Sequence, residues 1–109
     1  MAVAKFKTDI PSAELEAMPG KAAAASDLLK ALSHQSRLLI MCHLNEKELN
    51  VSEIEEIMDI PQAQLSQHLA RLRLEGLVAT RREGRTIYYR NANKEAKAVV
   101  KLLYQLFCK

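Results

Sequence analysis

The sequence predicts a mainly α-helical domain with one small β-hairpin, and three features of residues 50–91 lead to that fold class. Two short helical patterns lie at residues 51–58 and 62–75, with a tight break between them. Two strand patterns follow at once, at residues 77–81 and 86–89, around a glycine turn. This order is that of a winged helix-turn-helix, which the flanking segments extend to about five or six helices and a two-stranded wing.

The N-terminal third is predicted to be helical after a loose start. Residues 1–10 show no hydrophobic periodicity, so we expect a flexible arm there and a single folded domain at residues 11–109. A short helix is expected to begin at Pro11 and to end at the Pro19-Gly20 pair. A second helix is expected over residues 21–32, where alanines and leucines give high helix propensity.

A third helix is predicted to follow a cap at Ser33 and to run to about Leu44. Most of its apolar side chains are expected to be buried; they include Leu38, Leu39, Met41 and Cys42. The first helix of the motif, residues 51–58, can be capped by Asn50 or Ser52. Its early glutamates suit the positive end of the helix dipole, and its apolar residues recur at helical spacing.

The second helix of the motif has one apolar face and one polar face. Pro61 suits its first turn, where a missing N–H is no loss, and Gly76 suits its C-terminal end. The inward residues are predicted to be leucines: Leu65, Leu69, Leu72 and Leu74. The other face offers side chains that can hydrogen-bond to base edges and phosphates: Gln62, Gln64, Ser66, Gln67, His68 and Arg71.

The adjoining hairpin decides between a helix face that is merely solvated and one that binds DNA. Arg81, Arg82 and Arg85 lie in or beside its turn at residues 82–85. A hairpin tip that carries arginines directly after a polar helix is typical of a wing that binds the phosphates of a nucleic-acid backbone. The sequence therefore predicts double-stranded DNA as the partner, with Arg82 and Arg85 at the backbone or the minor groove.

Charge and composition agree with this interpretation. Residues 1–61 carry a net charge of −4 and residues 62–109 one of +7, and such a basic half is the electrostatic footprint expected for a polyanion. No apolar run approaches the roughly 20 residues that cross a bilayer, and no signal peptide is recognised, so we expect a cytoplasmic protein without a membrane partner. The sequence shows neither a nucleophile–base pair nor a phosphate-binding loop, so we expect neither an enzyme nor a bound cofactor.

The last helix is predicted to run from a cap at Asn93 to about Phe107. Its apolar stripe is broad and includes Val99, Leu102, Leu103 and Leu106. The stripe can fold back on its own domain or meet a second copy of the chain; we favour a homodimer, because the winged domain already has a core. A dimer also suits a palindromic operator, whose half-sites lie about 10 bp apart.

Two stretches resemble the ArsR/SmtB family of bacterial repressors. Leu65–Val78 is similar to the family's recognition helix, with the pattern S-x-H-L-x-x-L-R-x-x-G-L-V. Ala31–Ile40 resembles the family's A-L-x-x-x-x-R-L-x-I stretch, and the match covers about residues 20–108. The resemblance implies a homodimeric winged-helix repressor that leaves its operator when an inducer binds.

The ligands of the family's two usual metal sites are missing. The thiol site needs Cys-x-Cys at the start of the first motif helix, where this chain has Asn50-Val51-Ser52. The zinc site needs histidines on the C-terminal helix, which offers Glu95, Tyr104, Gln105 and Cys108 instead. His34, Cys42 and His43 remain as isolated candidates, so a repressor with an atypical metal site stays an alternative.

Cys42 and Cys108 are the only cysteines, on two helices that pack together in this family. The pair resembles that of the sulfide- and persulfide-responsive, biofilm-associated subgroup, which implies a dithiol switch with reactive sulfur species or oxidants as inducer. One thiolate attacks the inducer, and the second thiol closes a disulfide or polysulfide bridge. From the residues alone, the alternative is that both cysteines are buried apolar fillers.

A further alternative belongs to a different class. A winged-helix domain can serve as a protein-interaction module whose wing contacts another protein rather than DNA. The basic C-terminal half and the wing arginines argue against that function.

Overall fold

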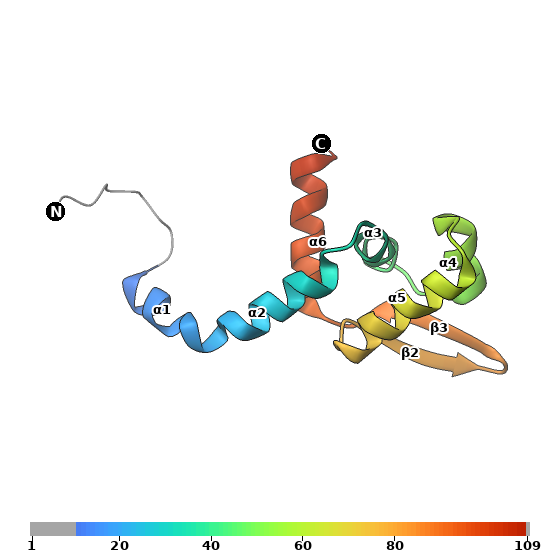
Figure 1. Cartoon of the computed structure of the whole chain (residues 1–109), viewed down its shortest axis with the longest axis horizontal. Coiled ribbons are helices and arrows are strands. Elements are labelled where there is room, and N and C mark those ends of the chain that lie inside the picture. The colour runs from blue at the N-terminus through green and yellow to red at the C-terminus, as the bar shows by residue number, and fades with distance from the viewer. Residues whose placement is uncertain (1–10, 109) are drawn as a thin grey trace.

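In the computed structural model, which describes residues 11–108, the chain folds into six helices and three strands (Figure 1). In chain order these are α1 Ser12–Ala17, α2 Pro19–Leu32, α3 Gln35–His43, β1 Leu49–Asn50, α4 Val51–Met58, α5 Gln62–Leu74, β2 Val78–Glu83, β3 Thr86–Asn91 and α6 Lys94–Phe107. The predicted fold class, a mainly helical winged helix-turn-helix, is confirmed. The arm expected at residues 1–10 lies outside the described residues.

The wing is a three-stranded antiparallel sheet in the order β1-β3-β2. β2 and β3 form the predicted hairpin, and Gly84 opens its two-residue turn with a φ of 63°. The prediction of only two strands is wrong, because β1 pairs with β3 and places Leu49 opposite Tyr89. A strand of two residues is too short to leave a period-two pattern in the sequence.

Two helix boundaries differ from those predicted. The first helix ends at Ala17, just before the Pro19-Gly20 pair as predicted, but the second helix begins at Pro19 rather than at Lys21. Pro19 suits this position because its missing N–H has no helical partner to lose. Ser33 does not cap α3 but ends α2. The cap of α3 is His34, whose Nδ1 accepts the backbone N–H of Ser36 at 3.1 Å. Imidazole is a less common cap than a hydroxyl, so the serine was the more obvious candidate.

The other helix ends follow local chemistry as predicted. Asn50 caps α4, and Glu53 completes a capping box, with 2.9 Å between donor and acceptor in each direction. Gly76 follows α5 in the left-handed conformation, with a φ of 75°. Asn93 caps α6 through a hydrogen bond from a backbone N–H in the first turn.

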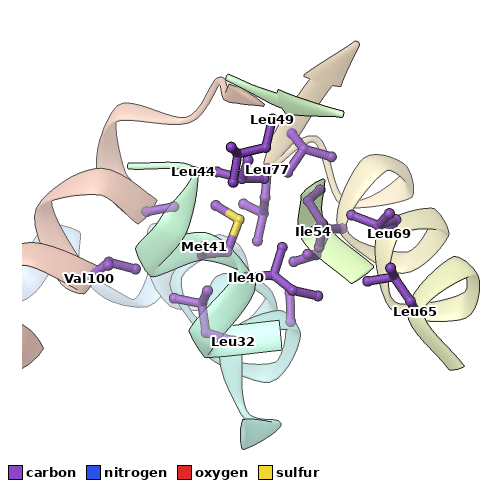
Figure 2. Packing of buried hydrophobic residues seen from close by; sticks show 14 residues of the cluster. Leu32, Ile40, Met41, Leu44, Leu49, Ile54, Leu65, Leu69, Leu77 and Val100 are labelled. Atoms are coloured by element: carbon purple, nitrogen blue, oxygen red, sulfur yellow. The ribbon is translucent and has the colours of Figure 1, made fainter. Parts of the chain in front are cut away.

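The core lies where α3, α4, α5, the base of the wing and the start of α6 meet (Figure 2). Its buried apolar residues are Ala31, Leu32, Ile40, Met41, Leu44, Leu49, Ile54, Leu65, Leu69, Leu72, Leu77, Val78, Ala96 and Val100. Leu39, Cys42 and Leu74, predicted to be inward, are exposed instead. Ile40 and Met41 occupy the inward face of α3, and Leu74 lies about half a turn from Leu65 around α5, so these side chains point away from the core.

Figure 1 shows α1 and α2 running outward from this body. Only the C-terminal part of α2 reaches the core, through the buried Ala31 and Leu32 and the partly buried Leu28. Further along this extension Leu15, Met18 and Leu29 are exposed. The extension therefore carries apolar surface that the single chain does not cover.

Candidate nucleic-acid interface and paired thiols

α5 is held by one face and presents the other to solvent. Leu65, Leu69 and Leu72 are buried as predicted and anchor the helix against the core. The predicted polar contacts on the remaining surface are exposed: Gln62, Gln64, Ser66, Gln67 and Arg71. Arg71 forms an ion pair with Glu75 at 3.2 Å along the same helix. The structure thus brings these five side chains together on one accessible helix.

His68 occupies a different place from its neighbours on α5. It is half-buried, and its ring centroid lies 4.4 Å from that of His34, the cap of α3. Burial, followed by the charges of His34 and Arg37, lowers the pKa of His68. The side chain therefore favours its neutral form and connects α5 to the start of α3.

The two predicted wing arginines are both exposed. Arg82 lies within β2, opposite Ile87, rather than in the turn where the sequence placed it. Arg85 is in the turn itself, directly after Gly84. Within residues 11–108, no carboxylate lies close enough to form an ion pair with either guanidinium. Both remain available to an external anion.

Arg81 has a different environment from the other wing arginines. Its Nε lies 2.8 and 3.1 Å from the two carboxylate oxygens of Glu48, and its Nη1 lies 2.7 Å from Glu83. The guanidinium also stacks over the ring of Tyr88, 4.5 Å from the centroid. Hydrogen bonds to Glu83 and then Glu48 raise the pKa of Arg81. Arg81 and Arg82 could not be distinguished from the sequence alone, because Glu48 lies 33 positions before Arg81.

The two cysteines line one cavity between α3 and α6. The cavity has a volume of about 340 Å³, and its walls are formed by Leu38, Leu39, Cys42, Leu103, Tyr104, Phe107 and Cys108. Both cysteines are free, and both are exposed in the single chain although the Cys42 thiol is partly covered, which argues against the buried fillers of the alternative interpretation. Burial, followed by the charge of Cys108, raises the pKa of Cys42. We refer to this site as the thiol cavity.

The apolar stripe of α6 divides into two parts. Leu102 and Leu106 are 52% and 63% exposed, so they face away from their own domain. Val99 packs against the core, and Leu103 lies in the wall of the thiol cavity. The exposed part of the stripe is the part available to a second copy of the chain.

In the described part of the chain, no three His, Cys, Asp or Glu side chains are grouped closely enough to hold a metal ion. None of the helices in residues 11–108 combines the length and the apolar character that a bilayer crossing needs.

Comparison with known proteins places these features in context. A family model for the bacterial regulatory protein, ArsR family, matches residues 34–80. The chain is 44% identical over 94 residues to the transcriptional activator HlyU of Vibrio cholerae, which covers 86% of this chain and 87% of that protein. The structure of reduced HlyU from Vibrio cholerae has a TM-score of 0.82 at 42% identity, and covers 86% of this chain and 99% of the other. The transcriptional repressor BigR from Xylella fastidiosa also has a TM-score of 0.82 at 42% identity, with coverages of 87% and 97%.

Proposed function

Because the chain belongs to the ArsR family of bacterial regulatory proteins and is a DNA-binding transcriptional regulator, we propose that it is a homodimeric repressor switched by its two cysteines. In the reduced state it binds a palindromic operator. Reactive sulfur species or oxidants join Cys42 to Cys108, and the protein leaves the DNA. The single observation that carries this proposal is that both thiols line one cavity.

Binding of DNA is assigned to α5 and the wing. The exposed glutamines of α5, together with Ser66 and Arg71, reach base edges in the major groove. Arg82 and Arg85 contact phosphates or the minor groove, where arginine charges are favoured. His68 supports α5 from the side of α3 and is the member of the predicted set with least access to DNA.

The chemistry at the thiol cavity balances with a hydropersulfide, RS–SH, as the donor. The donor transfers its outer sulfur to one cysteine, which gives Cys–S–SH and releases RSH. The second thiol then attacks the Sγ atom of the first cysteine in this persulfide, which closes a Cys–S–S–Cys disulfide and displaces the transferred outer sulfur as hydrogen sulfide. A second transfer before closure leaves one additional sulfur in the bridge, which relaxes the limit of about 7 Å that a simple disulfide sets on its Cα atoms.

The raised pKa of Cys42 bears on the rate of this reaction. A thiolate is the attacking species, and a raised pKa leaves a smaller thiolate fraction at neutral pH. The attack by Cys42 should therefore accelerate as the pH rises toward that pKa.

The proposal is tested with a duplex that the reduced protein selects from a random-sequence pool, here called the selected duplex. Glutathione persulfide should release the unaltered protein from it, with loss of two alkylatable thiols and, where sulfur is retained, added mass in intact-mass spectrometry. Cys42→Ser and Cys108→Ser should stay bound under the same treatment. Normal release of either variant would refute the dithiol switch. Release by zinc rather than by persulfide would favour the atypical metal site.

A further inference from the structure

The strongest unassigned cluster of charged side chains lies partway along the wing, between its base and its turn. Arg81 on β2 contacts Glu48, Glu83 and the ring of Tyr88, as described above. Glu48 lies in the segment between α3 and β1, and Tyr88 lies on β3 directly opposite Arg81. One guanidinium thus joins both strands of the hairpin to a segment outside it.

This arrangement matters because the inner end of the hairpin is held in the core by Val78 and by hydrogen bonds from Asn91 to Leu44 and Asn45, whereas its outer half has few other contacts. β1 contributes only Leu49 and Asn50 to the sheet, and the outer residues of β2 and β3 are largely exposed. An isolated two-stranded hairpin is only marginally stable in water. Contacts that join the hairpin to the preceding segment therefore restrict where its tip points.

We propose that Arg81 is a positioning residue that orients the wing through Glu48, and that it does not itself bind a DNA phosphate. Two carboxylates surround its single positive charge, so the cluster of Arg81, Glu48 and Glu83 carries a net charge of −1. A phosphate would have to displace one of these carboxylates before it reached the guanidinium. Arg82 and Arg85, by contrast, have no such partner in the described part of the chain.

Glu48→Gln distinguishes the two roles by the sign of its effect. Removal of a negative charge near DNA strengthens binding if charge alone matters, and it would also free Arg81 for a phosphate. If Glu48 holds the wing, the same substitution weakens binding to the selected duplex, by about two- to fivefold as expected for an exposed ion pair. All measurements use the reduced, full-length protein, so the outcome does not depend on the thiol switch.

The salt dependence of binding gives a second, independent readout. Arg81→Gln should weaken binding by a similar factor while the slope of log Kd against log salt stays unchanged. Arg82→Gln is the matched control, since loss of a phosphate contact lowers that slope by about one unit. Combined Arg81→Gln and Glu48→Gln should weaken binding no more than Arg81→Gln alone, because that variant already lacks the Arg81–Glu48 interaction. Circular dichroism and thermal melting confirm that each variant is folded.

Arg81→Lys also distinguishes a positioning role from phosphate binding, because it keeps the positive charge at this position. A lysine binds phosphate well but cannot reproduce the planar contact with Glu48 and Tyr88. Weaker binding with an unchanged slope is therefore expected. Tighter binding by Glu48→Gln, a slope reduced by about one unit in Arg81→Gln, or additive losses in the double variant would each overturn the proposal.

Discussion

Leu106 on α6 offers the most direct test of the proposed homodimer. Its side chain is 63% exposed in the single chain, and full burial of a leucine contributes about 1.5–3 kcal/mol. Burial of the exposed part in an interface therefore contributes about 1–2 kcal/mol per subunit. Twofold symmetry uses the residue twice, which gives about 2–4 kcal/mol, or roughly a 30- to 1000-fold change in the dimer Kd. Leu106→Glu loses this contribution and adds the cost of a charge in an apolar contact.

Sedimentation over a series of protein concentrations measures this change. Leu74→Glu is the matched control, because Leu74 is a leucine that is 83% exposed on a different helix, α5. The control should dimerise like the unaltered protein, whereas Leu106→Glu should be monomeric at the same concentration. An unchanged Kd for Leu106→Glu, or an equal loss in the control, would refute the assignment of the interface to α6.

The wing and α5 should differ in how they affect DNA recognition. Arg85→Ala should weaken binding to every duplex and lower the slope of log Kd against log salt by about one unit. Gln64→Ala should instead lose about 1–3 kcal/mol of discrimination between the selected duplex and random duplexes. Equal losses on both duplexes for the two variants would contradict this division. Acidification should destabilise the fold through His68. Burial, followed by the charges of His34 and Arg37, lowers the pKa of this residue in the folded protein. The unfolded chain therefore binds a proton at His68 more readily than the folded chain does. The melting temperature should be steady above about pH 7.5 and should fall below about pH 6.5. If the melting temperature of His68→Gln falls by the same amount, the pH dependence comes from other groups.

Local signals made most of the fold predictable from the sequence. The buried leucines of α5 recur at helical spacing, and Asn50, Gly76 and Asn93 act on residues within a few positions of themselves. Such interactions depend only on neighbouring residues, so they leave a pattern that can be recognised without the structure. The hairpin turn at Gly84 is of the same kind.

Features that depend on distant residues were missed. β1 exists because Leu49 and Asn50 meet β3, about 40 positions later, and neither residue shows strand alternation by itself. The cap at His34 could not be told from one at the adjacent Ser33 without knowing where α2 ends. The separation of Arg81 from Arg82 likewise needs the position of Glu48.

The same distinction applies to the candidate sites. The sequence identified the two cysteines, but the apolar cavity that they share depends on how α3 packs against α6. It also placed His68 with the residues of α5 that are predicted to face DNA, whereas the structure brings its ring to His34. Residues were therefore easier to nominate than to assign to a role, because the role depends on the neighbour that each side chain meets.

The geometry of α3 suggests how the proposed reaction of the thiols can change the binding of DNA by α5. The helix has nine residues, a length of about 14 Å, and it carries Cys42 near its C-terminal end. At its other end, His34 contacts His68 on α5. A helix this short is stiff, and Ile40 and Met41 are buried in the core, so we expect a bridge that pulls Cys42 toward α6 to tilt the helix about these residues rather than to bend it. We propose that such a tilt would displace His34 and with it the support of α5, and would thereby couple the thiol cavity to the predicted DNA-binding surface.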